Sequence, residues 1–506
     1  MCSRVLGLVR EQVFAGLFGA GYAYDAFVVA FRIPNLLRDL FGEGALSAAF
    51  VTVFSEYDTS KGPEATWQLA SNVLVFISIL LSAITLAGIF FAENIVNLLA
   101  PDFSLVAGKT ELTSLLTMIM FPFLLFVALS AVVMGMLNTK GKFFIPAMSS
   151  SFFNLGSIIG GVSLALLLPG FGLPAIVGMA WGTLIGGLMQ LAIQLPSLRK
   201  IGFRFKPQLN LRDPGLHRIL WLMLPATVGL SATQINIFVN TNFASSCVEG
   251  SVSWLNYAFR MVQLPIGVFG VAFSIAAMPV LAKQAAQKDF TALRRTFSSS
   301  LVMVFSLTIP ATVGLILLSE PIIRLIFEHG AFDAFDTRQT ALALTCYAYG
   351  LFAYSAVKIM VPVFYALNDT KYPVIGSFLA VAANITIILL TIDSFEFRAI
   401  ALATSSAMTL NFLFLGFVLY RKLTGFSLAY LFLGVSKILA ASIVMGTGVV
   451  ALRKFLYPLF TGNITLQLAA VFLTIGAAAV IYAITLYFLR LPELKLITGK
   501  IISRFS

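Results

Sequence analysis

Charged side chains inside otherwise apolar segments are the residues of this 506-residue chain that could carry chemistry. Chief among them are Arg4, Arg10, Asp25, Arg32, Arg38, Asp39 and Glu43 near the N-terminus, and Arg260 in the second half. Asp25, Arg32 and Asp39 recur at every seventh position, which places them on one face of a straight helix. A central Arg costs roughly 2.5–3.5 kcal/mol on membrane-insertion scales, so such residues usually face a cavity or a partner. Cations held in this way would bind an anion, and the guanidinium fork of Arg suits phosphate oxygens in particular.

The same charges could instead pair locally, for example Arg38 with Glu43 or Asp25 with Arg10. Intramembrane pairs of this kind are common. For any single residue, local pairing and substrate binding are about equally supported by the sequence. For the group as a whole we favour a binding function, because cations on three separate apolar segments exceed what local pairing needs.

A proline lies among these charges. Pro34 cannot donate to the carbonyl of Ala30, so a kink is expected between Arg32 and Arg38. Broken helices near the middle of a membrane free backbone groups that can face a cavity and bind a substrate.

Membrane-spanning helices must position these side chains. The chain is 59% hydrophobic and only 11% charged, with a mean hydropathy of +0.96, whereas soluble domains carry roughly 25% charged residues. Apolar runs bounded by charged residues or by Gly, Pro and Asn predict fourteen spans, at 4–18, 24–52, 68–91, 112–137, 144–168, 172–195, 216–241, 251–281, 297–318, 338–366, 373–392, 398–420, 427–451 and 463–489. The first run is short against the ~20 residues that cross a bilayer.

The distribution of basic residues predicts the topology. Most of the 33 Lys and Arg residues fall in alternate loops and in the C-terminal tail. This asymmetry predicts a membrane protein with both termini in the cytoplasm. It also explains the net charge of +12 without nucleic acid as a partner. The loop at 196–215 is the longest basic stretch, and we expect it to rest on anionic membrane lipids.

Signals for an enzyme or a cofactor are poor. The three cysteines, Cys2, Cys247 and Cys346, form no metal-binding spacing, and the chain has no phosphate-binding P-loop and no HExxH motif. The sequence therefore predicts a transporter without a catalytic site, cofactor or ATPase module. An ion gradient, the membrane potential, or the supply and removal of substrate would have to drive it.

Two short patterns recur between the halves of the chain. Ala30-Phe31-Arg32 returns as Ala258-Phe259-Arg260, and Leu137-Asn138 with Asn154 returns as Leu367-Asn368 with Asn384. The nearly constant separation indicates a parallel six-helix repeat. We therefore expect two pseudo-symmetric lobes around a central cavity, at 1–195 and 216–422, joined by a basic linker at 196–215. Residues 423–506 would add two helices and a cytoplasmic tail. Rocking of one lobe against the other would give alternating access.

At these residues the sequence resembles the lipid II flippases of the MurJ/MviN family, in the MOP exporter superfamily. The stretches that carry the resemblance are Ser3-Arg4-Val5-Leu6-Gly7 with Arg10, Asp25-Ala26-Phe27, Pro34-Asn35-Leu36-Leu37-Arg38, Glu43-Gly44-Ala45, Gln234-Ile235-Asn236, Tyr257-Ala258-Phe259-Arg260, and Phe327-Glu328-His329-Gly330-Ala331-Phe332. The fourteen predicted helices agree with this family.

The resemblance implies a substrate and a site. Such proteins move the undecaprenyl-diphosphate-linked peptidoglycan precursor from the cytoplasmic to the periplasmic leaflet, as part of cell wall biogenesis. The residues implied at the substrate are Arg4, Arg10, Asp25, Arg38 and Arg260, to which we add Arg32, Glu43 and Gln263. Helices 13 and 14 would form a groove for the lipid tail.

The chain departs from the family pattern at three points. Family members begin with more apolar sequence, so we expect the start of helix 1 to be missing here. Some members carry Glu where this chain has Gln263. Others bind sodium through acids in helices 7 and 11, in the region where this chain has Asn240 and Asn384.

Three alternatives remain open at this point. The substrate could be another polyprenyl-diphosphate-linked glycan. A multidrug exporter of the same superfamily is disfavoured, since a cation exporter would place acids in its cavity. A membrane glycosyltransferase would need acidic metal ligands or a base at the membrane surface, and no convincing Asp pair is present.

Overall fold

The regular structure of this protein is helical throughout the part that the computed structural model describes, residues 2–39 and 45–491. The described residues form two compact units. Unit 1 runs to Ser253 and includes Gly330–Phe332, and unit 2 comprises Trp254–His329 and the described residues from Asp333 onward. This grouping places the helix at 214–245 in unit 1, whereas the sequence repeat assigns 216–241 to the second lobe. The lobe boundaries stay a prediction.

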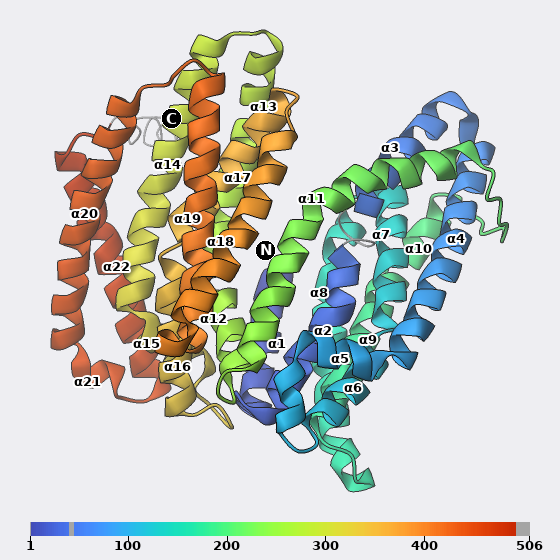
Figure 1. Ribbon diagram of the computed structural model, residues 1–506, viewed down its shortest axis with the longest axis horizontal. Coiled ribbons are helices and arrows are strands. Elements are labelled where there is room, and N and C mark those ends of the chain that lie inside the picture. The colour runs from blue at the N-terminus through green and yellow to red at the C-terminus, as the bar shows by residue number, and fades with distance from the viewer. Residues whose placement is uncertain (1, 40–44, 492–506) are drawn as a thin grey trace. The chain divides into compact units, whose positions relative to one another are not determined.

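Unit 1 contains the first eleven α-helices and two short 3-10 helices (Figure 1). They are α1 (Cys2–Phe18), α2 (Tyr22–Arg38), α3 (Ala45–Ser60), α4 (Gly62–Phe90), α5 (Ala92–Leu99), η2 (Pro101–Leu105), α6 (Lys109–Met120), α7 (Phe123–Thr139), α8 (Phe144–Leu167), η3 (Leu168–Phe171), α9 (Ile176–Ala192), α10 (Leu195–Lys200) and α11 (Pro214–Ser245).

Unit 2 contains the remaining helices, of which α12 begins in unit 1. They are α12 (Ser251–Pro265), the π-helical turn η4 (Ile266–Val271), α13 (Ala272–Ala286), α14 (Phe290–Leu317), α15 (Ser319–Phe327), α16 (Ala334–Ala348), α17 (Leu351–Ala366), α18 (Lys371–Phe395), α19 (Phe397–Lys422), α20 (Leu428–Phe455), α21 (Tyr457–Phe460) and α22 (Ile464–Phe488).

The predicted membrane spans coincide with these helices. Each predicted segment lies on one described helix or on successive ones: 24–52 comprises α2 and α3, and 338–366 comprises α16 and α17, which are bent by 43°. Helix α2 continues through Pro34 and ends at Arg38. Within the described residues, ten helices are long and apolar enough to cross a membrane, or eleven if the bent pair counts as one span. The protein is therefore an all-helical, multi-pass membrane protein.

Glycine allows α8 and α9 to pack at very short distance. A Cβ on Gly182 of α9 would lie 2.5 Å from the Cα of Gly161 on α8, and one on Gly178 would lie 2.2 Å from the backbone nitrogen of Ala165. Small residues let helix backbones approach in this way inside a membrane, where helices associate by close packing.

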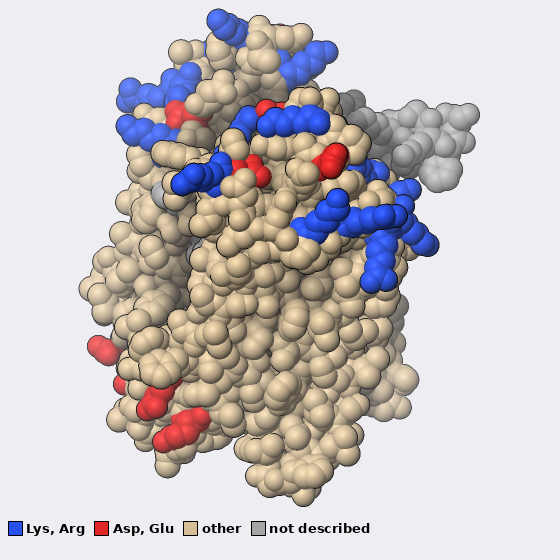
Figure 2. All heavy atoms as spheres, turned by 90° about the vertical axis from the view of Figure 1, so that its right-hand side faces the viewer, with Lys and Arg blue, Asp and Glu red and all other residues tan. Residues whose placement is uncertain are grey.

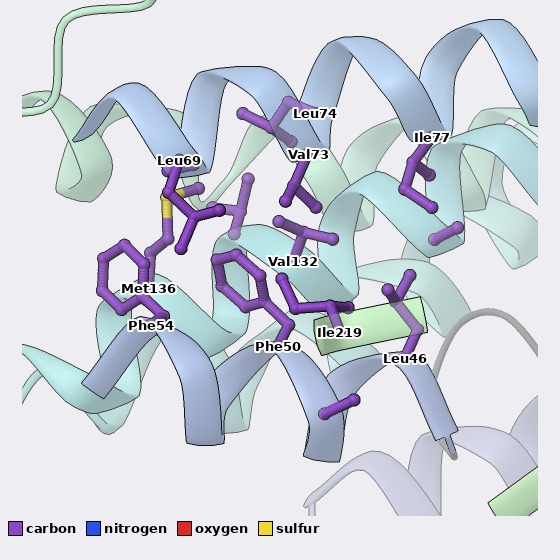
Figure 3. Close-up of a cluster of buried hydrophobic side chains, with 14 of the residues drawn as sticks. Leu46, Phe50, Phe54, Leu69, Val73, Leu74, Ile77, Val132, Met136 and Ile219 are labelled. Atoms are coloured by element: carbon purple, nitrogen blue, oxygen red, sulfur yellow. The ribbon is translucent and has the colours of Figure 1, made fainter. Parts of the chain in front are cut away.

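An apolar core in unit 1 fixes the start of α11. Asp213 caps this helix by accepting a hydrogen bond from the backbone N–H of Gly215 (2.7 Å), and Pro214 occupies the first turn. Figure 3 shows Ile219 of α11 packed among side chains of α3, α4 and α7, including Phe50 and Val132. The linker that precedes α11 is thereby tied to unit 1.

Candidate functional site

Asp25 is the most completely coordinated acid of the predicted site. It lies on α2, is 1% exposed, and accepts four hydrogen bonds. Lys109 Nζ donates to Oδ2 over 3.1 Å, and the backbone N–H of Gly250 donates to the same oxygen over 2.9 Å. Ser253 donates to Oδ1 from its backbone N–H (2.9 Å) and from its hydroxyl (2.6 Å). Asp25 thus supplies an acceptor at the N-terminus of α12, where backbone donors lack helical partners.

Lys109 is a residue that sequence reasoning missed. It precedes the predicted span at 112–137, so the sequence predicts an ordinary solvent-exposed lysine in a loop. In the structure it begins α6, is 2% exposed, and its Nζ lies 4.4 Å from the centre of the Phe103 ring. The available signal was Asp25 itself: an acid in an apolar segment needs a cation close by, and Lys109 at the edge of a neighbouring segment could have been considered for that role.

Arg10 pairs with its sequence neighbour and not with Asp25. Its Nη2 lies 2.9 Å from Glu11 Oε1, and Glu11 also accepts a hydrogen bond of 2.7 Å from the hydroxyl of Tyr24. Arg10 is 9% exposed, and its guanidinium lies 5.4 Å from the centre of the Phe153 ring. Its Nε is buried without a hydrogen-bond partner among the described residues. The guanidinium therefore keeps one donor that a ligand could use.

Arg38 also pairs with its neighbour. Its Nε and Nη2 donate to Asp39 Oδ1 over 3.2 and 2.9 Å, and Gln234 of α11 donates to Asp39 Oδ2 over 3.2 Å. Glu43, the alternative partner, lies outside the described residues. Arg32 donates to the hydroxyl of Thr241, also on α11. In unit 1, α11 therefore carries polar partners for the last turns of α2.

The remaining predicted residues differ in their exposure. Arg4 is exposed on α1, while Arg260 is half-buried and Gln263 exposed on the unit 2 part of α12. Asn240 is half-buried on α11, and Asn384 is fully buried on α18, where Thr404 donates to its Oδ1 over 3.4 Å. The described residues contain no group of three or more His, Cys, Asp or Glu side chains placed to hold a metal ion. A binding role for these side chains stays a prediction.

Unit 1 thus presents arginine–carboxylate pairs on α1 and α2 inside a largely apolar body. Transferring a guanidinium from water to such a place is costly, and each adjacent carboxylate offsets part of that cost. A doubly charged phosphate ester could accept hydrogen bonds from the same guanidinium groups. The arrangement is suited to binding an anion.

Comparison with known proteins identifies the family. Residues 14–493 match the family model described as Lipid II flippase MurJ. A Buchnera aphidicola protein named probable lipid II flippase MurJ is 36% identical over 83% of this chain and 82% of its own length. A Vibrio cholerae protein of the same name is 36% identical over 84% of this chain and 80% of its own.

Solved structures give the same result. A lipid II flippase MurJ in an inward closed conformation has a TM-score of 0.79 and 31% identity, and the match covers 96% of this chain and 97% of that one. An inward-facing multidrug transporter of the MATE family has a TM-score of 0.71 but only 14% identity, over 83% of this chain and 95% of that one, and so shares the fold alone. Because the family model spans nearly the whole chain, this protein belongs to the MurJ family of lipid II flippases.

Proposed function

We propose that this protein moves lipid II, the undecaprenyl-diphosphate-linked precursor of peptidoglycan, from the cytoplasmic to the periplasmic leaflet by alternating access. The observation that carries the proposal is the match of residues 14–493, in both units, to the lipid II flippase family. The membrane fold, the buried Arg10 and the half-buried Arg38 and Arg260 support it, since the substrate is an anion attached to a long apolar chain.

The arginines of unit 1 would bind the diphosphate. Arg10 would donate from its Nε, which has no hydrogen-bond partner among the described residues, and Arg38 would donate from the guanidinium that lies beside Asp39. A diphosphate must lose water when it enters the protein, and charge-assisted hydrogen bonds with the fork of Arg offset that loss. Arg4 and Arg32 would extend the cationic surface. Asp25 would act indirectly, because all of its described contacts are made with protein donors.

We assign the same chemistry to Arg260 in unit 2. It lies on an apolar helix and is half-buried, so its charge is not freely hydrated. Its neighbour Gln263 is exposed and can donate and accept hydrogen bonds to sugar or peptide groups. An ion gradient, the membrane potential, or the supply and removal of substrate would drive the cycle. Asn240 and Asn384 stand in the region where some family members carry sodium-binding acids, so a sodium site here would lack those acids.

The distribution of charge supports the proposed location. Figure 2 shows, on one face of the molecule, Lys and Arg side chains gathered toward one end, a wide uncharged band, and acidic side chains alone at the opposite end. An uncharged band is what the hydrocarbon core requires, and the basic end corresponds to the cytoplasm. This pattern supports an inner-membrane location, and the excess of Lys and Arg in alternate loops of the sequence supports cytoplasmic termini.

Complementation tests the function in cells. A bacterium depleted of its own lipid II flippase should grow when it expresses this chain, and an Arg10→Gln variant present at the same level should fail to support growth. Failure of the wild-type chain, although present in the membrane, would contradict the proposal.

A reconstituted system tests the chemistry. Liposomes that contain the protein and fluorescent lipid II should show movement of the label between leaflets without release of a sugar. Release of a sugar, or movement of an uncharged polyprenol at the same rate, would point to a different activity.

A further inference from the structure

The linker between α10 and α11 is an ordered arm that lies against the start of α4. This basic arm, residues 203–212, has no regular secondary structure, yet five interactions fix it to α4. Phe203 is buried with its ring 5.4 Å from that of Trp67. Gln208 Nε2 donates to the carbonyl of Gln68 over 2.9 Å, and the N–H of Lys206 donates to the hydroxyl of Ser71 over 3.4 Å.

Asn72 provides the remaining two interactions. Its side-chain amide is fully buried and pairs with the backbone of Asn210 in both directions: Nδ2 donates to the Asn210 carbonyl over 2.9 Å, and Oδ1 accepts from the Asn210 N–H over 2.8 Å. A buried amide satisfied in this way holds the chain in one conformation. The arm therefore presents fixed side chains to its surroundings.

Those side chains alternate between basic and apolar. Arg204, Lys206 and Arg212 are exposed, and so are three apolar side chains between them: Phe205 is 54% exposed, Leu209 49% and Leu211 56%. None of the three basic residues forms an ion pair with an acid in the described ranges 2–39 and 45–491. An arm surrounded by water would gain nothing by exposing Phe and Leu in a fixed position.

The arm lies at the level where α4 enters its apolar stretch. It contacts residues 67–72, and the sequence has no charged residue between Glu64 and Glu93. Farther along this helix, Ile79 and Leu86 are 54% and 68% exposed, as expected of lipid-facing side chains. The boundary between charged and uncharged sequence corresponds to the headgroup region of a bilayer.

We propose that the basic arm is a docking strip for anionic phospholipid headgroups of the surrounding leaflet. Arg204, Lys206 and Arg212 contact the phosphates, while Phe205, Leu209 and Leu211 insert below them among the upper acyl carbons. Basic residues near an anionic surface and apolar residues at the interface act together in this manner. The occupant is a leaflet phospholipid, independent of the transported substrate, so the proposal stands apart from the proposed function.

Lipid retention by the whole protein tests the proposal. The purified protein in a neutral detergent is titrated with phosphatidylglycerol or with phosphatidylcholine of the same acyl chains, and bound lipid is counted by native mass spectrometry. The arm variant is Arg204→Gln/Lys206→Gln/Arg212→Gln. The control variant is Lys283→Gln/Arg295→Gln/Lys371→Gln, which removes the same charge from exposed positions of unit 2.

We expect phosphatidylglycerol to bind the wild type more tightly than phosphatidylcholine at low ionic strength. The arm variant should lose about a hundredfold of that affinity, since each basic residue near an anionic surface contributes roughly a factor of five. The control variant should change it by less than about threefold. Equal losses in the two variants would show a general charge effect and overturn the proposal.

A second variant tests the apolar half of the strip. Phe205→Ser/Leu209→Ser/Leu211→Ser keeps every charge, and it should lower the affinity for phosphatidylglycerol about tenfold or more if these side chains enter the membrane interface. Unchanged affinity in this variant, or binding of soluble glycerol phosphate as tight as that of the lipid, would refute docking to a leaflet. Melting temperatures of all variants establish that each is folded.

Discussion

Replacing Asp25 by Asn should destabilise unit 1 strongly, because it leaves Lys109 charged and buried without its partner. Lys109 and Asp25 are 2% and 1% exposed, and their charged atoms are 3.1 Å apart. Breaking a buried pair of this kind by removing one member costs about 3–5 kcal/mol. In addition, Asn has one oxygen where Asp has two, so either the N–H of Gly250 or both donors of Ser253 lose their acceptor.

A double-mutant cycle isolates the pair. Asp25→Asn, Lys109→Met and the double variant are unfolded with a denaturing detergent, and the fluorescence of the four Trp residues is followed. Once Asp25 is neutral, removing the Lys109 charge should relieve part of the damage, so the double variant should be more stable than the sum of the single effects by about 2 kcal/mol or more. The exposed Glu93→Gln on α5 removes one acid without a buried partner and should cost less than about 0.5 kcal/mol. Additive effects within about 0.5 kcal/mol would show that Lys109 and Asp25 do not stabilise each other.

Three further predictions concern function, pH and topology. Arg260→Ala should abolish transport and weaken lipid II binding about ten- to a hundredfold. Arg260→Lys should keep part of both, because Lys retains the charge but lacks the planar guanidinium that forms two parallel hydrogen bonds. Unchanged affinity of the folded Arg260→Ala protein would contradict a binding role. The hydrogen bond from Lys422 holds the pKa of Asp369, in the turn before α18, below its usual value. The stability from this contact is therefore present above the unfolded pKa and lost as the pH falls through the lower folded value. The melting temperature of the wild type should approach that of Asp369→Asn on acidification from about pH 5 to pH 3, and a constant difference would refute the linkage. A cysteine introduced near Lys200 should resist an impermeant thiol reagent added to intact cells, whereas one near Asp336 should react, and the opposite result would reverse the topology.

The sequence was sufficient to predict the helices and the charged positions on them. Apolar runs are long in this chain and charge is scarce, so both spans and boundaries follow from composition. The exceptions are predicted spans that comprise more than one helix: 24–52 comprises α2 and α3, and 338–366 comprises α16 and α17, which are bent by 43°. A hydropathy pattern does not register such a bend when the residues on both sides of it are apolar.

The partners of the charged residues could not be predicted in the same way. Pairing of Arg10 with Asp25 was one alternative that the sequence left open, and the structure shows other pairs: Arg10 contacts Glu11, while Asp25 contacts Lys109. Which acid meets which cation depends on the rotation of α1, α2 and α6 about their axes and on side-chain direction, and neither is encoded by spacing within one helix. The pairing between Asn72 and Asn210 was missed for the same reason, since it joins a helix to an irregular arm.

The glycine contacts between α8 and α9 bear on how this protein can move. Elsewhere in a helical bundle, side chains between two helices can change rotamer and allow one helix to slide by an ångström or two. Between Gly161 and Gly182 no such layer exists, because backbone meets backbone. These two helices should therefore move as one rigid body. The conformational change of a transport cycle should be concentrated at helix–helix interfaces made of larger side chains that can change rotamer. A spin-label pair across α8 and α9 should keep a single narrow distance distribution whether or not substrate is present.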